Sequence, residues 1–325
     1  MDSNVSKNTN SHNFFKLRVD CEKLDISVRD LLSKELLSSL TLYQQQLDVK
    51  IEHSWLATII KNKTAISNHK NNTTILSENG ALGIASAGKF IPIVYGCPLG
   101  LSLTTTLQQS PAIIVKRVGN LLILRQKNKQ RDCEFELLTE RLASGWINFY
   151  LDAKFIGSWL SKLFARSPIH TKRLRQDPSL DRHTARLLPV QYLHARCCSL
   201  LALGAREKLL VFDFDSGCLK YPEAIAWLDE QQNLWFKEAA EYNLIRQLLI
   251  VTDAWVGDNN RQWKKLAFNL SRATDVFLAD CRFLGKIKAE YPQLAIARLG
   301  LIALVRFWLE KILQIKLNLP APYEM

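Results

Sequence analysis

The residues with the clearest capacity for chemistry lie in the segment LPVQYLHARCCSLL at 188–201. His194, Cys197 and Cys198 could in principle supply a thiol nucleophile with its base, or part of a metal site. At helical spacing Cys197 falls on the apolar stripe, whereas His194 and Cys198 are expected elsewhere around the helix. Adjacent cysteines on different sides of a helix cannot easily bind one metal, and no carboxylate nearby would orient the histidine. We therefore interpret Cys197 as a small core residue.

A second candidate site is the Asp-x-Asp of LLVFDFDSGCL at 209–219. It resembles the opening strand of haloacid-dehalogenase-type phosphatases, in which Asp213 would be the nucleophile and Asp215 the general acid. Those enzymes continue with Gly-Thr and an α/β core that holds Mg²⁺, whereas Ser-Gly and a segment of helical pattern follow here. A phosphatase stays open as an alternative, and we prefer a loop between helices that ends at Pro222.

Other catalytic and cofactor-binding motifs are missing from the sequence. It contains no G-x-x-x-x-G-K-[ST] phosphate loop, no strand-following G-x-G-x-x-G and no H-E-x-x-H. The seven cysteines include no C-x-x-C pair, which argues against both a zinc site and a disulfide framework. We expect no metal or cofactor, and a reducing, cytoplasmic location.

The composition points to a polyanionic partner. Among 325 residues, 43 Lys and Arg stand against 31 Asp and Glu, a formal net charge of +12. Such a balance favours nucleic acid or an acidic membrane surface. The longest apolar stretch, 299–313, is interrupted by charged residues, and the polar start lacks the apolar core of a signal peptide. We therefore expect no membrane-spanning segment.

The chain divides into two parts with different patterns. After a polar tail at 1–12, residues 13–165 alternate short apolar runs with Gly and Pro, which predicts a mixed α and β domain. Residues 166–186 are basic, contain two prolines and have few large apolar side chains, so we expect an exposed linker. Residues 187–325 follow a period of about 3.6, which predicts an all-α bundle and gives the whole chain an α+β fold class.

The predicted bundle contains about five helices. Pro189 suits the first turn of one helix, a stripe beginning at Trp263 marks another, and a further helix should follow Pro292. We expect two more helices near 222–236 and 238–256.

The second part resembles the C-terminal DALR anticodon-binding domain of arginyl-tRNA synthetases. VQYLHARCCSLL is similar to the V-Q-Y-A-H-A-R helix of that family, and FLADCRFLG at 277–285 to its F-Y-x-x-C-x-V-L-G segment. The final stretch, ARLGLIALVRFWLEKILQIKLNLPAPYEM, resembles the family's ending up to Met325. The resemblance covers 187–325 and implies the DALR type of helical bundle.

The first part resembles the N-terminal additional domain of the same enzymes. YGCPLGLSLTTTLQQSPAIIVKRV at 95–118 and the GWINF element match family patterns, although the family's Gly-Pro-Gly is replaced by Ala143, Ser144 and Gly145. The H-I-G-H-like and K-M-S-K-like signatures of the intervening catalytic domain are missing. The linker of about twenty residues that stands in its place is too short for a nucleotide-binding sheet. We therefore expect no aminoacylation by this chain.

The resemblance implies a non-catalytic tRNA-binding protein that favours the anticodon arm of arginine tRNAs. Carried over by position, Tyr192 and Arg196 on the first bundle helix, Arg282 and Lys286 on the fourth, and Met325 would line the anticodon surface. Asn148 would contact the tRNA elbow. The four-residue spacing of Arg282 and Lys286 would let both reach one row of phosphates on a helix.

An alternative is a scaffold that no longer binds RNA and docks on a synthetase or a tRNA-modifying enzyme. Four tryptophans could contribute to such an interface, although most are expected in the core: Trp227, Trp235, Trp255 and Trp263.

Overall fold

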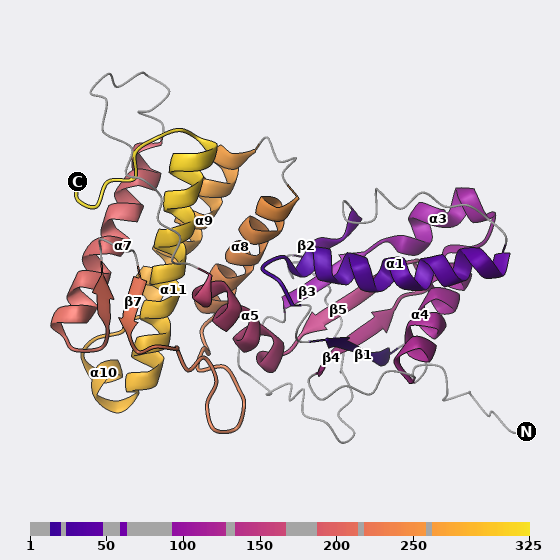
Figure 1. Cartoon of the computed structure of the whole chain (residues 1–325), viewed down its shortest axis with the longest axis horizontal. Helices are drawn as coiled ribbons and strands as arrows, with labels where there is room; N and C mark the ends of the chain where they lie inside the picture. Colours follow the sequence, from indigo (N-terminus) through magenta and orange to yellow (C-terminus); the bar gives the residue numbers. More distant parts are fainter. Residues whose placement is uncertain are drawn as a thin grey trace, which may run out of the picture. The chain divides into compact units, whose positions relative to one another are not determined.

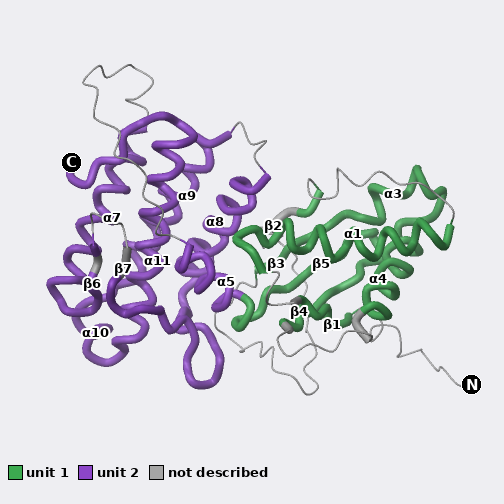
Figure 2. Tube along the Cα trace, in the orientation of Figure 1, with its two compact units in different colours: residues 1–67, 92–155 green, residues 68–91, 156–325 purple. Residues whose placement is uncertain are grey.

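The computed structural model of the chain describes residues 14–20, 24–47, 59–63, 93–127, 134–166, 187–213, 218–257 and 262–325 (Figure 1). The described residues form two units, the first ending at Phe155 and the second running from Ile156 to Met325 (Figure 2). The tail at 1–12 and all of the predicted linker except Arg166 lie outside the described residues.

The first unit is built on an antiparallel sheet with the strand order β1-β4-β5-β3-β2. The strands are β1 (Phe14–Asp20), β2 (Lys61–Lys63), β3 (Ile93–Cys97), β4 (Glu134–Arg141) and β5 (Ile147–Leu151). Its helices are α1 (Val28–Leu47), α3 (Leu99–Leu107) and α4 (Pro111–Lys127). The prediction of a mixed α and β domain is confirmed for this unit.

The β4–β5 hairpin of the first unit depends on a glycine. Gly145 adopts φ +89°, a conformation that favours glycine, and its N–H donates to the Leu142 carbonyl at 2.9 Å. The Gly145 carbonyl accepts from the Gly100 N–H at 2.9 Å, which ties the hairpin to the start of α3. A Cβ on Gly145 would lie 2.6 Å from Cβ of Pro111, so the close approach also requires glycine.

The division between the units falls before the predicted linker. Helix α5 (Ala153–Ala165) belongs to the second unit from Ile156 onward. It packs there on the 222–238 segment: the rings of Phe164 and Trp227 lie 6.3 Å apart edge to face. A Cβ on Gly157 would come within 2.9 Å of Leu228, so the backbone of α5 approaches this segment closely.

The second unit is mainly a helical bundle. After α5 it contains α7 (Leu188–Arg206), α8 (Ala239–Val256), α9 (Trp263–Asp280), α10 (Lys286–Glu290), α11 (Pro292–Lys311) and a π-helix (Ile312–Lys316). Helix α11 lies between α7 and α9 (Figure 1) and is buried around most of its circumference, as expected for a central helix. The helices predicted after Pro189, from Trp263, near 238–256 and after Pro292 are confirmed.

The prediction that this unit is all-α is wrong between α7 and α8. Strands β6 (Val211–Asp213) and β7 (Cys218–Tyr221) form an antiparallel pair where a loop was expected. The helix expected near 222–236 is replaced by irregular chain with a β-bridge between Leu228 and Leu234. The physical reason lies in the spacing of the buried side chains. Ile225 and Trp227, and then Leu234 and Phe236, are buried two residues apart, which is the period of extended chain.

We refer below to two ends of the bundle. The strap end is the end at which α7 and α9 begin and α8 and α11 finish; it is named after the C-terminal strap, residues 317–325, which continues from there (Figure 1). At the opposite end, α10 lies beside the last residues of α7, where Lys288 Nζ is 2.7 Å from Glu207 Oε2.

Replacing Gly300 of α11 with alanine is expected to destabilise the bundle by about 1–3 kcal/mol. An added Cβ would collide with Ile225 Cδ1 and lie 2.7 Å from Cη2 of Trp227, and this overlap outweighs the higher helix propensity of alanine. Thermal or urea denaturation measures the change. Gly257→Ala is the matched control, because its Cβ would meet no atom closer than 3.4 Å. Equal stability of the two variants would contradict the close packing of the 222–238 segment on α11.

Candidate nucleic-acid interface

Helix α7 presents an aromatic ring and a guanidinium on its outer side. Tyr192 is 55% exposed, and Arg196 lies one turn further along the helix. Arg196 Nη1 is 3.5 Å from Asp275 Oδ1 of α9, and both side chains are about half exposed. A surface ion pair of this kind contributes little, about 0–1 kcal/mol, so the guanidinium can exchange its partner for a phosphate at small cost.

Two residues of α7 that we predicted to lie away from its apolar stripe are buried as well. His194 and Cys198 are buried like Cys197, although we expected them elsewhere around the helix. The reason is that α7 is covered on more than one side, by α11, α9 and the C-terminal segment.

We call residues 317–325 the C-terminal strap, because they run along the first turns of α7. Gln191 Nε2 donates to the Pro320 carbonyl at 2.8 Å, and His194 Nδ1 lies 2.8 Å from the Pro322 carbonyl. A carbonyl oxygen can only accept, so Nδ1 of His194 carries a proton and donates this hydrogen bond. Two hydrogen bonds from α7 thus fix the course of the strap.

The end of the strap is held by α11. Arg306 Nη2 donates to the Tyr323 hydroxyl at 2.9 Å, lies 3.0 Å from Glu310 Oε2, and its guanidinium carbon is 5.3 Å from the centre of the Tyr323 ring. Two residues further on, Met325 is 65% exposed. The strap therefore places an exposed methionine at the same end of the bundle as Tyr192. The anchoring residues were not among the predicted site residues; polar Gln191 and His194 on a helix with an apolar stripe were the available signal.

Protonation of His194 is expected to lower stability in mild acid. Burial lowers the His194 pKa to about 4, from 6.5 for an ordinary histidine. The unfolded chain therefore binds the proton first. Stability is complete above about pH 6.5 and is lost as the pH falls toward 4, with about 2 kcal/mol gone at pH 5. Denaturation at pH 7 and pH 5 measures this, and His194→Gln should remove that part of the pH dependence. An unchanged pH dependence in the variant would contradict the assignment to His194.

The adjacent cysteines are not poised for nucleophilic chemistry. Burial raises the pKa of Cys197 well above its ordinary value and that of Cys198 to about 11, so both remain thiols at neutral pH. In the Asp-x-Asp segment, Asp213 Oδ2 is 3.0 Å from Lys220 Nζ, and Asp215 lies outside the described residues. Within the described ranges no cluster of His, Cys, Asp or Glu could hold a metal ion.

We predicted that Arg282 and Lys286 lie on one helix, and this prediction is wrong. Helix α9 ends at Asp280, and Arg282 follows in irregular chain. Gly285 turns the chain with φ +64°, and Lys286 opens α10. Both side chains are exposed, but they lie at the opposite end of the bundle from Tyr192 and Met325. The predicted anticodon residues therefore fall into two separate groups.

Asn148 is placed inside the sheet of the first unit. It is buried on β5, and its Nδ2 donates to Glu140 Oε2 at 2.9 Å. Tyr150 donates its hydroxyl to the same oxygen at 2.7 Å, and burial, followed by this hydrogen bond, raises the tyrosine pKa. The Asn148 amide thus holds a carboxylate, which makes it poorly suited to meet an RNA phosphate.

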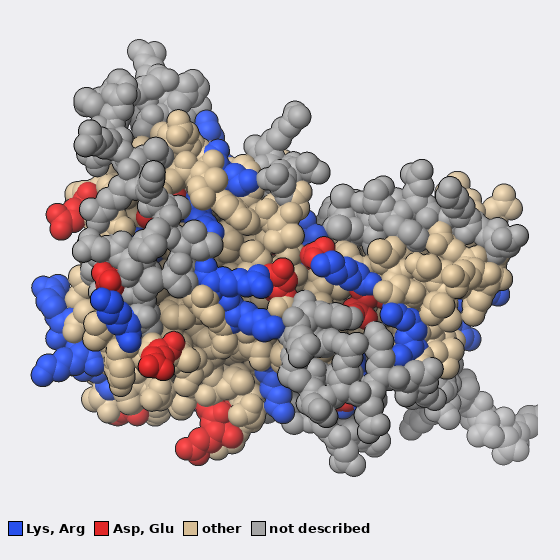
Figure 3. Space-filling view, in the orientation of Figure 1, with Lys and Arg blue, Asp and Glu red and all other residues tan. Residues whose placement is uncertain are grey.

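The charges of the described residues are spread over both units. On the face drawn in Figure 3, Lys and Arg side chains lie over each unit with Asp and Glu among them. Among the tryptophans considered for a protein interface, Trp227 and Trp263 are buried and Trp235 and Trp255 are half-buried. No described helix is long and apolar enough to cross a membrane.

Comparisons with known proteins add no functional assignment: no protein-family model matches the chain, and neither curated proteins nor solved structures give a significant match.

Proposed function

We propose that this chain binds tRNA at the strap end of the helical bundle and does not aminoacylate it. The anticodon surface, as we define it, consists of Tyr192, Arg196 and Met325. The observation that carries the proposal is the exposed Tyr192 ring one turn from the Arg196 guanidinium, beside a strap that is fixed by hydrogen bonds from the same helix.

The chemistry of these side chains suits an RNA loop. An exposed tyrosine ring can stack on an unpaired base, and a guanidinium can pair with a phosphate or a base edge. The methionine side chain adds a flexible apolar contact. The net charge of +12 supplies the long-range attraction for a polyanion.

The preference for arginine tRNAs and the lack of catalysis are supported by the sequence alone. The helical part resembles the anticodon-binding domain of arginyl-tRNA synthetases, and the sequence contains neither signature of their catalytic domain.

A salt series with purified tRNA tests the proposal. The association constant should fall linearly with salt concentration on a log–log plot, because phosphate contacts release counterions. Double-stranded DNA of similar length is the comparison, and it should bind more weakly because it offers no unpaired base for Tyr192. Lack of binding at low salt, or equal affinity for tRNA and duplex DNA, would contradict the proposal and favour a scaffold for another protein.

A further inference from the structure

A group of aromatic rings lies at the strap end of the bundle, away from the anticodon surface on α7. Trp255 comes from the last turn of α8, Trp263 opens α9, and Phe307 and Trp308 lie on α11. The Trp255 ring packs edge to face against Trp263 at 5.6 Å and against Trp308 at 5.4 Å. Three helices thus contribute to one rigid cluster.

Two lysines are held against these rings. Lys311 Nζ lies 4.7 Å from the centre of the Phe307 ring and 5.3 Å from that of Trp255. Lys316 Nζ lies 4.8 Å from the Trp255 ring and 5.0 Å from the Trp263 ring. Each ammonium is therefore within cation–π range of at least two rings.

The π-helix explains how both lysines reach Trp255. Residues five apart do not share a face of an α-helix, since 3.6 residues complete each turn. Ile312–Lys316 is instead a π-helix, and the Leu317 N–H donates to the Ile312 carbonyl five residues back at 3.0 Å. The wider turn brings Lys316 toward the side of Lys311. Such short π-helical turns occur frequently at functional sites.

The cluster offers positive charge at a partly apolar surface. Trp255, Lys311 and Lys316 are half-buried, and the neighbouring Val256 and Ile315 are exposed. Within the described part of the chain, the electrostatic contacts of Lys311 are with rings rather than with carboxylates. Burial lowers the pKa of Lys311 because it removes the ammonium group from water. The neighbouring rings compensate only part of this desolvation cost, so an anion that approached the ammonium would stabilise its charged form.

We propose that Lys311 and Lys316 form a phosphate clamp for the RNA backbone, positioned by Trp255, Trp263, Phe307 and Trp308. This inference rests on the proposed function, since it adds a second contact for the same tRNA. The π-helix continues directly into the C-terminal strap, so the clamp and the anticodon surface lie at one end of the bundle. One RNA loop can then stack a base on the Tyr192 ring and contact the ammonium groups of Lys311 and Lys316 with its phosphates. The exposed apolar side chains next to the lysines suit the sugars and base edges of unpaired nucleotides.

The test measures tRNA binding over a salt series of about 50–300 mM for three variants of the cluster and one control variant. Lys311→Gln and Lys316→Gln should each reduce the log–log salt slope by about 0.7–0.9, the value for one lost phosphate contact. Trp255→Leu leaves the net charge unchanged and should still weaken binding about threefold, because the lysines lose a ring that positions them. Lys237→Gln is the matched control, since this exposed lysine lies at the opposite end of the bundle; it should change the slope by less than half as much.

A measurement on the wild-type chain keeps the inference testable if a variant fails to fold. In acetylation footprinting read by mass spectrometry, saturating tRNA should protect Lys311 and Lys316 more than Lys237. Equal protection of all three lysines, or a variant slope equal to that of the wild type, would overturn the clamp while leaving tRNA binding intact. If the lysine variants lose binding to phosphatidylserine vesicles while their tRNA binding is unaltered, the two lysines form a lipid site. That result would also overturn the clamp. If the wild-type chain binds no tRNA at low salt, the proposed function fails and the clamp fails with it.

Discussion

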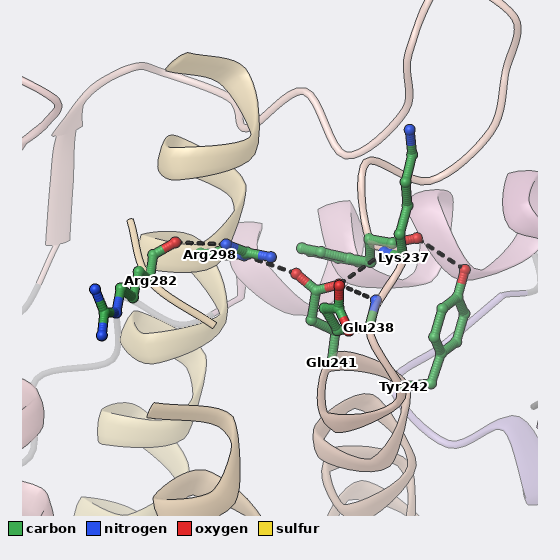
Figure 4. Close-up of polar contacts among 7 residues, drawn as sticks. Lys237, Glu238, Glu241, Tyr242, Arg282 and Arg298 are labelled. Atoms are coloured by element: carbon green, nitrogen blue, oxygen red, sulfur yellow. Dashed lines mark hydrogen bonds and ion pairs between the residues drawn. The ribbon is translucent and has the colours of Figure 1, made fainter. Parts of the chain in front are cut away.

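Replacing Arg298 with methionine is expected to lower the free energy of unfolding by about 3–5 kcal/mol. Arg298 Nε donates to Glu241 Oε1 at 2.7 Å, and Nη1 donates to the Arg282 carbonyl (Figure 4). The Arg298 and Glu241 side chains are only 7% and 0% exposed. Without the guanidinium, the carboxylate remains buried with no cation beside it, and its desolvation is no longer offset. Urea denaturation followed by circular dichroism measures the loss.

The controls separate this buried pair from a general effect of removing charge. Arg282→Met makes the same chemical change on a side chain that points away from the pair (Figure 4), and it should alter stability by less than about 0.5 kcal/mol. In the double variant Arg298→Met with Glu241→Gln, the loss should be smaller than the sum of the single losses, because a neutral amide needs no cation. A stability of Arg298→Met within 1 kcal/mol of the wild type would contradict the prediction.

The buried pair matters because Glu241 also organises the start of α8. Its Oε2 accepts the backbone N–H groups of Lys237 at 2.7 Å and Glu238 at 2.8 Å, completing a capping box with Glu238. Glu241 therefore connects the irregular 222–238 segment, the first turn of α8 and the central helix α11. Loss of this connection would also weaken the packing of the 222–238 segment on α11.

Local sequence signals predicted the helices of the bundle well. Pro189 at the beginning of α7, Pro292 at the beginning of α11 and the apolar stripe that starts at Trp263 all mark helices that the structure contains. These signals work because they depend on residues within one or two turns: a proline that needs no helical N–H, and side chains that share a face. The mixed α and β pattern of residues 13–165 could be predicted for the same reason, because it depends on residues that are close in sequence.

The chain between α7 and α8 could not be predicted in this way. Trp227 is held by Phe164 of α5 and by the surface of α11 around Gly300, which are distant in sequence. Such contacts override local helix propensity, and no residue within the segment reveals them. The two-residue spacing of Ile225 with Trp227 and of Leu234 with Phe236 indicates extended chain, but it does not show which surfaces bury these side chains.

The candidate site was predictable where it depends on one helix. The exposed side chains of Tyr192 and Arg196 follow from their spacing on α7. The pairing of Arg282 with Lys286 failed because α9 ends before Arg282, and Gly285 was the signal that the helical spacing stops there. The strap and the aromatic–lysine cluster join residues more than fifty positions apart, such as His194 with Pro322 and Trp255 with Lys316, so spacing alone could not reveal them.

Combining Tyr192→Ala with Arg196→Glu is expected to weaken tRNA binding by about 3–5 kcal/mol, or about two to four orders of magnitude in Kd. The stacked ring accounts for about 1–3 kcal/mol and the charge-assisted contact of the guanidinium for a similar amount. Both side chains are outside the core, so the far-UV circular dichroism and the melting temperature should remain close to those of the wild type. Filter binding or fluorescence anisotropy with arginine tRNA at about 150 mM salt measures the change.

A matched charge reversal at the opposite end decides which surface the RNA uses. Arg196→Glu and Arg282→Glu change the net charge equally, but Arg196 lies on the middle turns of α7 and Arg282 follows the end of α9. From Arg196 to Arg206 at the end of α7 the helix rises ~15 Å, whereas charges are screened beyond about 8 Å at physiological salt. If the tRNA is bound by the anticodon surface, Arg196→Glu should therefore weaken its affinity, whereas Arg282→Glu should change the affinity by less than about twofold. If Arg282→Glu instead weakens binding and Arg196→Glu does not, the tRNA lies across α10, and the ring of Tyr192 takes no part in recognition.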